Sequence, residues 1–306
     1  MGASNDNIED LNNLSDALAR AAEIAGRSTV LVDARQRMPA SGIAYTSELV
    51  LTADHVIERE EEIRVLLPNG QPVPASIAGR NPIRDIALLR LSQAVATQAV
   101  SADQPARIGQ IALALGRPEP SGIQASLGVI SAMGGPVRLG HGGLLEQYIR
   151  TDTIPFPGFS GGPLINIRGQ ILGLNTSGLS MGTLLTIPVS IAWQAAASLA
   201  AYGHIRRGYL GIRSQAVNLS PAQVESLNRD QKTGLLIVNV EDGSPAAMAG
   251  LVTGDLLVGI SSKQVRDHEE LQIHLEGDSI GRTLPVDILR GTTLTTFMVV
   301  IGEHAE

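Results

Sequence analysis

A serine stands among glycines near the middle of the chain, in the run Gly158-Phe159-Ser160-Gly161-Gly162-Pro163. Glycine lets the backbone adopt conformations that other residues avoid, and it lets another molecule approach the main chain closely. A hydroxyl held in such a turn can be exposed, with backbone amides pointing at the group that it attacks. A short Gly-Ser-Gly run by itself is more often a plain tight turn. The run therefore predicts a nucleophile only if the chain also supplies a base and an acid.

The base is predicted to be His55. A serine hydroxyl is a poor nucleophile near neutral pH, so it needs a base, and the base needs a group that orients it and stabilises its positive charge. His55 follows the apolar run Leu49-Val50-Leu51, and a strand end is a rigid place from which to present an imidazole. An isolated histidine is more often packed or solvated than catalytic. The remaining histidines lie in predicted loops, in the linker, in the second unit or at the C-terminus: His141, His204, His268, His274 and His304.

The acid is predicted to be Asp85, which opens the apolar strand predicted over residues 86–91. A carboxylate at such a place can be partly desolvated and can bond to a histidine. Asp54 and Asp152 are rival acids. Asp54 adjoins His55 in sequence, so its side chain is expected to point to the opposite face of the strand.

His55, Asp85 and Ser160 follow one another in the order of the chymotrypsin-type arrangement. The runs around them, residues 51–56, 85–89 and 158–164, resemble the motifs of trypsin-like serine proteases and, more closely, those of the HtrA/Deg family. The resemblance covers nearly everything after residue 15. It continues through Gly128-Val129-Ile130-Ser131, Gly173-Leu174-Asn175-Thr176, Ile187-Pro188, Gly208-Tyr209-Leu210-Gly211-Ile212 and the run from Gly243 to Asp255.

The elements that must position these residues are mostly strands. The chain has 306 residues, enough for about two domains, and its 33 glycines and 16 prolines separate many short apolar runs. Asn69-Gly70 predicts a hairpin turn. Helices are predicted over residues 9–26, 188–203, 245–249 and 268–275, the third opened by Ser244 as a cap.

The fold that the resemblance implies is mainly β, with a two-barrel chymotrypsin/trypsin-like protease domain followed by a C-terminal α+β PDZ domain. The predicted boundaries are an N-terminal helical arm over 1–27, the protease domain over 28–203, a linker over 204–207 and the PDZ domain over 208–306. The arm is expected to pack on the body or on a neighbouring subunit.

The resemblance also implies the roles of the residues. Ser160 would attack the scissile carbonyl, His55 would take the proton, and Asp85 would orient His55. The amides of Gly158 and Ser160 would form the oxyanion hole, and neither a metal nor a cofactor is needed. Thr183, Leu184 and Leu185 would wall the specificity pocket, where no acidic residue stands, so small or medium aliphatic side chains are expected before the cut.

The PDZ unit would bind the C-terminus of a peptide by strand addition. The loop residues Tyr209, Leu210, Gly211 and Ile212 would cradle its carboxylate. Leu271 and Leu275 either line the groove or face the core of the unit, and the sequence leaves both readings open.

Two other hypotheses remain. Phe159 stands where the family usually has Asn, which is expected to place an apolar ring beside the site, and Pro155 and Pro157 stiffen the loop. These residues motivate a catalytically silent or switched-off chaperone or peptide-binding protein on the same fold. An α/β-hydrolase is disfavoured because its Gly-x-Ser-x-Gly motif opens a helix and its histidine comes last in the chain.

Composition limits the partners. The net charge is −7 and no basic tail or patch is present, so nucleic acid is not expected. The chain has no cysteine, and no apolar run reaches the about 18–20 residues of a membrane span. The first residues lack the features of a signal peptide. The family implies polypeptide substrates, a homotrimer and an extracytoplasmic location in the periplasm or cell envelope. The sequence itself is also compatible with a cytoplasmic location.

Overall fold

The computed structural model describes residues 3–135, 137–138, 144–145, 147–179, 184–204, 208–275 and 279–303. Side chains are described for these residues apart from 3–7, 138, 144, 269 and 273. The chain divides into two compact units, Met1–His204 and Ile205–Glu306. Each unit is described by itself.

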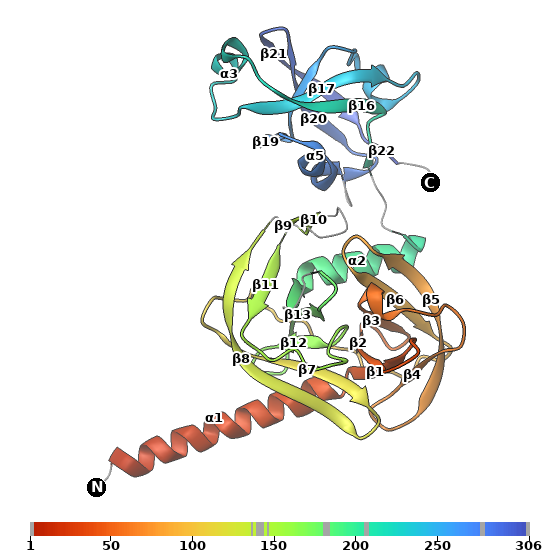
Figure 1. Cartoon of the computed structure of the whole chain (residues 1–306), viewed down its shortest axis with the longest axis vertical. Helices are drawn as coiled ribbons and strands as arrows, with labels where there is room; N and C mark the ends of the chain where they lie inside the picture. Colours follow the sequence, from red (N-terminus) through yellow and green to blue (C-terminus); the bar gives the residue numbers. More distant parts are fainter. Residues whose placement is uncertain are drawn as a thin grey trace. The chain divides into compact units, whose positions relative to one another are not determined.

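The first half of unit 1 is a closed barrel in the order β1-β2-β3-β6-β5-β4, drawn in red to orange in Figure 1. All its neighbouring strands pair antiparallel. Asn69-Gly70 lies in the turn between β4 and β5, and Gly70 has a φ of 83°, as the hairpin prediction requires. The strands of this barrel are β1 (Thr29–Asp33), β2 (Ala40–Ala44), β3 (Leu49–Thr52), β4 (Ile63–Leu66), β5 (Pro72–Asn81) and β6 (Ile86–Leu91).

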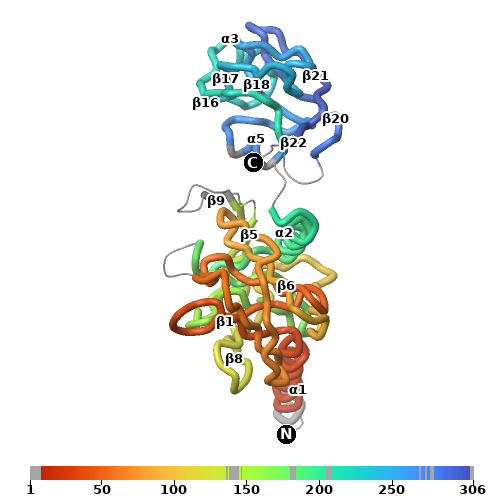
Figure 2. Tube along the Cα trace, turned by 90° about the vertical axis from the view of Figure 1, so that its right-hand side faces the viewer, coloured from red at the N-terminus to blue at the C-terminus, as the bar shows by residue number. Residues whose placement is uncertain are grey.

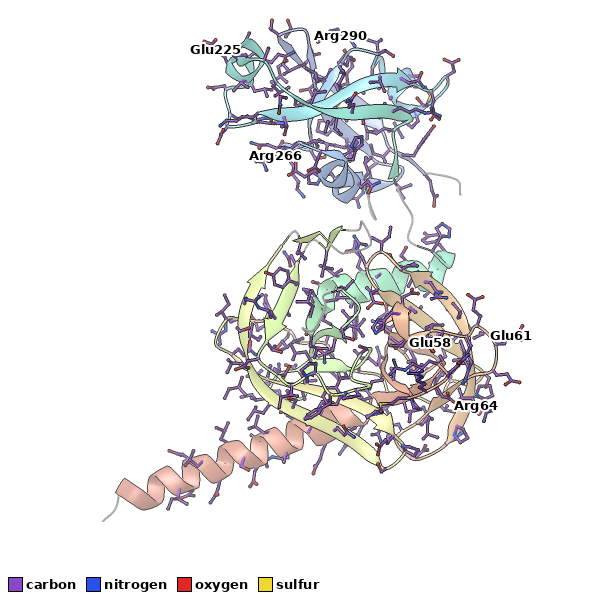
Figure 3. The ribbon with its side chains drawn as sticks, viewed as in Figure 1. Glu58, Glu61, Arg64, Glu225, Arg266 and Arg290 are labelled. Carbon is purple, nitrogen blue, oxygen red and sulfur yellow. The ribbon has the colours of Figure 1, made fainter. Side chains whose placement is uncertain are left out.

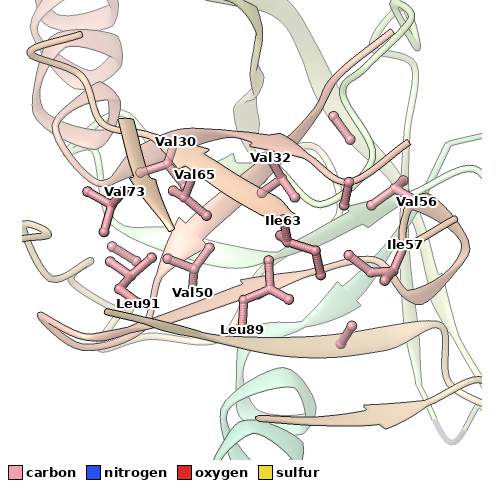
Figure 4. Packing of buried hydrophobic residues seen from close by; sticks show 14 of the residues in the cluster. Val30, Val32, Val50, Val56, Ile57, Ile63, Val65, Val73, Leu89 and Leu91 are labelled. Atoms are coloured by element: carbon pink, nitrogen blue, oxygen red, sulfur yellow. The ribbon is translucent and has the colours of Figure 1, made fainter. Parts of the chain in front are cut away.

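Alternating side chains fill the barrel. On β4, Ile63 and Val65 are buried in a cluster of valines, leucines and isoleucines, shown in Figure 4. Arg64 between them is exposed and points outward with Glu61 in Figure 3. This period of two is that of a strand with one face toward a core. The short helical turn Asp54–Val56 follows β3 directly and adds Val56 to the same core.

The second half of unit 1 is another closed barrel, in the order β11-β14-β13-β12-β7-β8. The two barrels confirm the predicted two-barrel architecture. The strands are β7 (Ile111–Glu119), β8 (Gly122–Gly134), β11 (Tyr148–Thr151), β12 (Pro163–Ile165), β13 (Ile171–Thr176) and β14 (Leu185–Pro188), with the pair β9 (Val137–Arg138) and β10 (Leu144–Leu145) outside the barrel.

Two helices belong to unit 1. Helix α1 (Ala3–Gly26) is longer than the predicted helix, and it contacts β7 and β12 of the second barrel and β1 of the first, with Ala21 and Ala25 buried. Its first half projects from the barrel surface (Figures 1 and 2), where Ile8 and Leu11 are 57% and 67% exposed. Helix α2 (Val189–Tyr202) packs on β5, β6 and β13 and ends at Gly203, which has a left-handed φ of 78°.

Unit 2 is built on the sheet β16-β17-β18-β20-β21, with β19 on β18 and a separate pair of β15 with β22. The helices α4 and α5 match the predicted ranges. Helix α3 was not predicted, although Ser220 and Gln223 form a capping box at its start. The strands are β15 (Gly208–Tyr209), β16 (Ile212–Asn218), β17 (Thr233–Val240), β18 (Leu256–Ile260), β19 (Lys263–Gln264), β20 (Thr283–Arg290), β21 (Thr293–Val300) and β22 (Gly302–Glu303), and the helices are α3 (Pro221–Leu227), α4 (Pro245–Ala249) and α5 (His268–Leu275).

Candidate active site

His55 and Asp85 form a close pair. The Nδ1 atom of His55 lies 2.8 Å from Oδ2 and 3.0 Å from Oδ1 of Asp85. The backbone N–H of His55 also donates to Oδ1 at 2.8 Å, so one carboxylate holds both the ring and the main chain of the histidine. Because an ionised carboxylate only accepts, Nδ1 carries the proton in this pair and Nε2 is left as the basic nitrogen. The His55 side chain is 33% exposed, so that nitrogen can be reached.

Asp85 is held by the loop between β5 and β6. Its φ is 54°, in the left-handed region that aspartate tolerates better than most residues, and its side chain is 6% exposed. The hydroxyl of Thr176, at the end of β13 in the second barrel, donates to Oδ2. The carboxylate therefore accepts bonds from both barrels, which fixes its position between them.

The rival acids have other partners. The carboxylate of Asp54 is buried and accepts from Arg80 on β5, with Nε 2.6 Å from Oδ1. That hydrogen bond raises the pKa of Arg80 above its ordinary value, against the opposing effect of burial. Asp152 accepts instead from the backbone N–H of Val129 at 2.6 Å. Asp54 and His55 lie in the short helical turn Asp54–Val56 and not on a strand, so the expectation of opposite strand faces was wrong, and Asp54 is instead engaged by Arg80.

A tight turn precedes the candidate nucleophile. The N–H of Phe159 donates to the carbonyl of Phe156 at 3.1 Å, and Gly158 has a φ of 84°. With Pro157 at its second position and Gly158 at its third, this is the residue pattern of a type II turn. A Cβ on Gly158 would lie 2.5 Å from Cβ of Pro118, so a side chain is excluded by space as well as by conformation.

Ser41 on β2 joins this turn to the first barrel. Its N–H donates to the carbonyl of Ser160 at 3.1 Å, and its hydroxyl donates to the carbonyl of Gly158 at 2.6 Å. The same hydroxyl accepts from the N–H of Arg117 at 2.8 Å, and its own carbonyl accepts from Thr52 at 2.7 Å. Ser41 is fully buried. The loop that carries Ser160 is thus fixed by a serine 119 positions earlier in the chain, which no local sequence signal indicates.

The ring of Phe159 packs in the barrel core and not beside the Ser160 hydroxyl, so that expectation was wrong. It is fully buried in the core of the second barrel with Ile130, Ile149 and Leu164. Room for it comes from Gly116 on β7, where a Cβ would lie 2.5 Å from the ring. Phe159 therefore anchors the loop in the core instead of covering the site.

The hydroxyl of Ser160 bonds to Ser177. The two Oγ atoms are 2.9 Å apart, and the N–H of Ser177 donates to Oγ of Ser160 at 3.3 Å. Ser160 is 7% exposed. Within the described residues no hydrogen bond joins Ser160 to His55, so the three predicted residues meet as a His55–Asp85 pair beside a Ser160–Ser177 pair. Thr176 and Ser177 were missed in the sequence, although the run Asn175-Thr176-Ser177-Gly178 places two hydroxyls after a buried strand.

The residues predicted to form the specificity pocket are on or next to β14. Thr183 lies outside the described residues. Leu184 is buried in the cluster that contains Phe159, and Leu185 is also buried. Leu185 pairs with Thr176, so β14 lies beside the strand that contacts Asp85.

The loop predicted to bind a carboxylate joins β15 to β16 in unit 2. The carbonyls of Leu210 and Gly211 accept from Ala246 and Glu241 at 2.8 and 2.9 Å, which holds the loop against α4 and the end of β17. Gly211 has a φ of 78°, and a Cβ there would lie 2.1 Å from Cβ of Ser244. The hydroxyl of Tyr209 donates to Glu241. Ile212 begins β16 and pairs with Val240.

Helix α5 lies beside the edge strand β16. Nε2 of His268 lies 3.0 Å from the hydroxyl and 2.9 Å from the carbonyl oxygen of Ser214. Leu271 and Leu275 are 6% and 5% exposed and pack in the core of the unit with Leu210. Of the two alternatives, lining the groove or facing the core, the structure shows the second. Burial lowers the pKa of His274 below its ordinary value, and the charge of Lys263 acts in the same direction.

The described residues contain no group of three or more His, Cys, Asp or Glu side chains arranged to hold a metal ion. No described helix combines the length and apolarity that crossing a membrane requires.

Both units of the chain match families of known proteins. Residues 40–174 match the family model of the trypsin-like peptidase domain, and residues 208–301 match that of the PDZ domain. HhoB of Synechocystis sp. is 31% identical over 273 residues, which are 85% of this chain and 65% of HhoB. The periplasmic pH-dependent serine endoprotease DegQ of Escherichia coli is 33% identical over 252 residues, 79% of this chain and 54% of DegQ. The chain thus spans between half and two thirds of the length of these relatives.

Solved structures are similar over nearly the whole chain. The HtrA-type protease AlgW with a decapeptide has a TM-score of 0.73 and 26% identity, covering 94% of this chain and 99% of that structure. The serine endoprotease from Yersinia pestis has a TM-score of 0.69 and 26% identity, with 94% and 98% covered.

Proposed function

This chain belongs to the HtrA/Deg family of trypsin-like serine proteases with a PDZ domain, and we propose that it is an ATP-independent serine endopeptidase. Its substrates are unfolded or exposed polypeptides, which it cleaves in protein quality control. The observation that carries the proposal is the bond of 2.8 Å between His55 and Asp85 beside the anchored loop of Ser160. A catalytically inactive protein on the same fold would not require a buried carboxylate that fixes the tautomer of a histidine.

In the proposed reaction, Oγ of Ser160 bonds to the carbonyl carbon of the scissile peptide while its proton passes to Nε2 of His55. Asp85 keeps the ring in place and stabilises its positive charge. The amides of Gly158 and Ser160 donate to the oxyanion. His55 then gives its proton to the leaving nitrogen as the carbon–nitrogen bond breaks, and water releases the acyl group by the same steps in reverse order.

The pocket for the residue before the cut would be walled by Thr183, Leu184 and Leu185. Two of these side chains are apolar, and no carboxylate stands among residues 183–188. We infer a preference for small or medium aliphatic side chains at that position. Peptide profiling that found efficient cleavage after Lys or Arg would contradict this.

The PDZ unit would bind peptide C-termini, for substrate capture or for regulation. Strand β16 ends the sheet order and pairs in the described sheet with β17, which leaves an edge for a further strand. The amides of the loop from Tyr209 to Ile212 would donate to the carboxylate, and the bonds that the carbonyls of Leu210 and Gly211 accept from Ala246 and Glu241 would keep the loop in place. Leu271 and Leu275 would support the groove from the core side.

The assembly and location are also part of the proposal. The exposed apolar side chains of Ile8, Leu11 and Leu14 on the projecting half of α1 favour contact with another copy, as in a homotrimer. An extracytoplasmic location is supported by relatives that are named periplasmic endoproteases.

A second candidate function is a switched-off chaperone or peptide-binding protein on the same fold. It is favoured by the bond of Ser160 to Ser177 instead of His55. Digestion of unfolded casein by wild type and by Ser160→Ala separates the two functions. The endopeptidase predicts fragments that disappear in Ser160→Ala, whereas the chaperone predicts intact casein with both proteins and equal client binding.

A further inference from the structure

The three residues that follow one another at the end of β13 each contact a different member of the site. The Thr176 hydroxyl donates to Oδ2 of Asp85. Gly178 lies over His55, since a Cβ there would be 2.6 Å from Nδ1 of the ring. Ser177, between them, contacts Oγ of Ser160 through both its hydroxyl and its N–H. This short segment therefore lies against all three members of the site, Asp85, His55 and Ser160.

The contacts of Ser177 occupy the nucleophile. A backbone N–H can only donate, so Oγ of Ser160 uses a lone pair to accept from it at 3.3 Å. The hydroxyl of Ser177 lies at 2.9 Å and competes for the remaining hydrogen-bonding capacity of Ser160. Acyl transfer requires instead that Ser160 donate its proton to Nε2 of His55. In the described structure that bond is absent, although His55 already has its tautomer fixed by Asp85.

We propose that Ser177 is a positioning residue that holds Ser160 in a resting arrangement, and that a bound polypeptide must displace it before Ser160 can bond to His55. The inference rests on the proposed function and specifies how the same site is regulated. Burial supports it, because Ser160 is 7% exposed and its hydroxyl therefore has little access to solvent in this arrangement.

The direction of the effect follows from which state the contact stabilises. The Ser177–Ser160 bond exists in the free enzyme and is broken in the reacting complex. Its removal therefore raises kcat/KM and lowers KM, while kcat changes little. The N–H of Ser177 remains in any substitution, so only the hydroxyl contact is lost, and a net hydrogen bond of ordinary strength corresponds to about a fivefold change.

The experiment measures the second-order rate at which diisopropyl fluorophosphate phosphorylates Ser160, with the serine oxygen displacing fluoride. This small probe reports on the nucleophile without needing the specificity pocket. Ser177→Ala is expected to react about five times faster than wild type. Ser177→Thr keeps a hydroxyl and should react like wild type. Ser177→Val has nearly the shape of the threonine variant but no hydroxyl, and it should react like Ser177→Ala.

Two controls make the result specific. Ser131→Ala removes a hydroxyl that bonds to the carbonyl of Arg150 at the surface of the same barrel, and it should leave the rate unchanged. Thermal melting of every variant tests folding. The pH midpoint of labelling should be the same in wild type and Ser177→Ala, because the substitution leaves the His55–Asp85 pair unchanged, while the plateau rate rises.

The outcomes separate this inference from the proposed function. Faster labelling of Ser177→Ala, or labelling of that variant alone, supports the resting arrangement. Equal or slower labelling of a folded Ser177→Ala overturns it and leaves the endopeptidase intact. If neither wild type nor any Ser177 variant is labelled at any pH, the proposed function fails and the inference fails with it.

Discussion

Replacing Ser41 by alanine should impair catalysis, although Ser41 is on the first barrel and Ser160 is carried by a loop of the second. The hydroxyl donates to the carbonyl of Gly158 at 2.6 Å and accepts from the N–H of Arg117 at 2.8 Å, and the residue is fully buried. Ser41→Ala leaves both backbone groups buried without this partner. An unsatisfied buried group costs about 1–3 kcal/mol, so we expect the free energy of unfolding to fall by about 2–4 kcal/mol after partial relaxation.

The catalytic effect follows from the place of the Gly158 carbonyl. It belongs to the peptide that links the two residues preceding Ser160, and freeing it loosens the turn that would aim the amides of the proposed oxyanion hole. Complete loss of one oxyanion donor costs about 10²–10³ in kcat. Loosening without removal should cost about 10- to 100-fold in kcat/KM, mostly in kcat, which is about 1.4–2.7 kcal/mol of transition-state stabilisation.

The assay is peptide or casein turnover together with chemical denaturation. Ser28→Ala is the matched control. Ser28, directly before β1, is also a buried serine, and its hydroxyl donates to the carbonyl of Ala25 at 3.0 Å and not to the loop that carries Ser160. It should lose stability without losing kcat. A folded Ser41→Ala that keeps the wild-type kcat, or a Ser28→Ala that loses as much activity, would rule out this role of Ser41.

Three further predictions concern the acid, the loop anchor and pH. Asp85→Asn should lower kcat by about 10⁴-fold by removing the acceptor that fixes the His55 tautomer; Asp54→Asn should keep kcat within about threefold, since that carboxylate serves Arg80. Steady-state kinetics distinguish them, and an equal loss in both would contradict the assignment. Phe159→Ala should destabilise unit 1 by about 3–5 kcal/mol by opening a cavity in its core, measured by denaturant unfolding, and a cost under about 1 kcal/mol would contradict the buried anchor. Because burial lowers the pKa of His274 in the folded state, its contribution to stability is present above the ordinary value of 6.5 and is lost as pH falls through the lowered pKa. The free energy of unfolding of unit 2, measured by denaturant unfolding, should thus fall more between about pH 7.5 and 5 in wild type than in His274→Gln, and an equal fall would contradict it.

Much of the architecture could be predicted from short-range signals. Ser244 with Pro245 gives a cap and a first helical residue, and α4 begins where they place it. Asn69-Gly70 marks the hairpin turn because only a few residues adopt its left-handed conformation. Helix α3 was missed because its seven residues are too short for a clear period, although Ser220 and Gln223 cap it as the capping pattern requires.

The contacts that complete the site could not be predicted, because they join residues far apart in the chain. The hydroxyl of Ser41 meets the carbonyl of Gly158 across 117 positions. The ring of Phe159 enters the core only because Gly116, on another strand, leaves space for it. A sequence shows that a ring is bulky and apolar, but the side on which it packs is decided by such tertiary neighbours.

If Ser160, His55 and Asp85 form a working nucleophilic site, a fluorophosphonate probe should label the chain covalently at Ser160. Intact mass and peptide mapping of the wild-type chain should show one adduct, on Ser160. The adduct should be absent in Ser160→Ala and strongly reduced in folded His55→Ala. An adduct on another residue, or no adduct on Ser160 in wild type and in Ser177→Ala at any pH and with hydrophobic C-terminal peptides present, would contradict the claim.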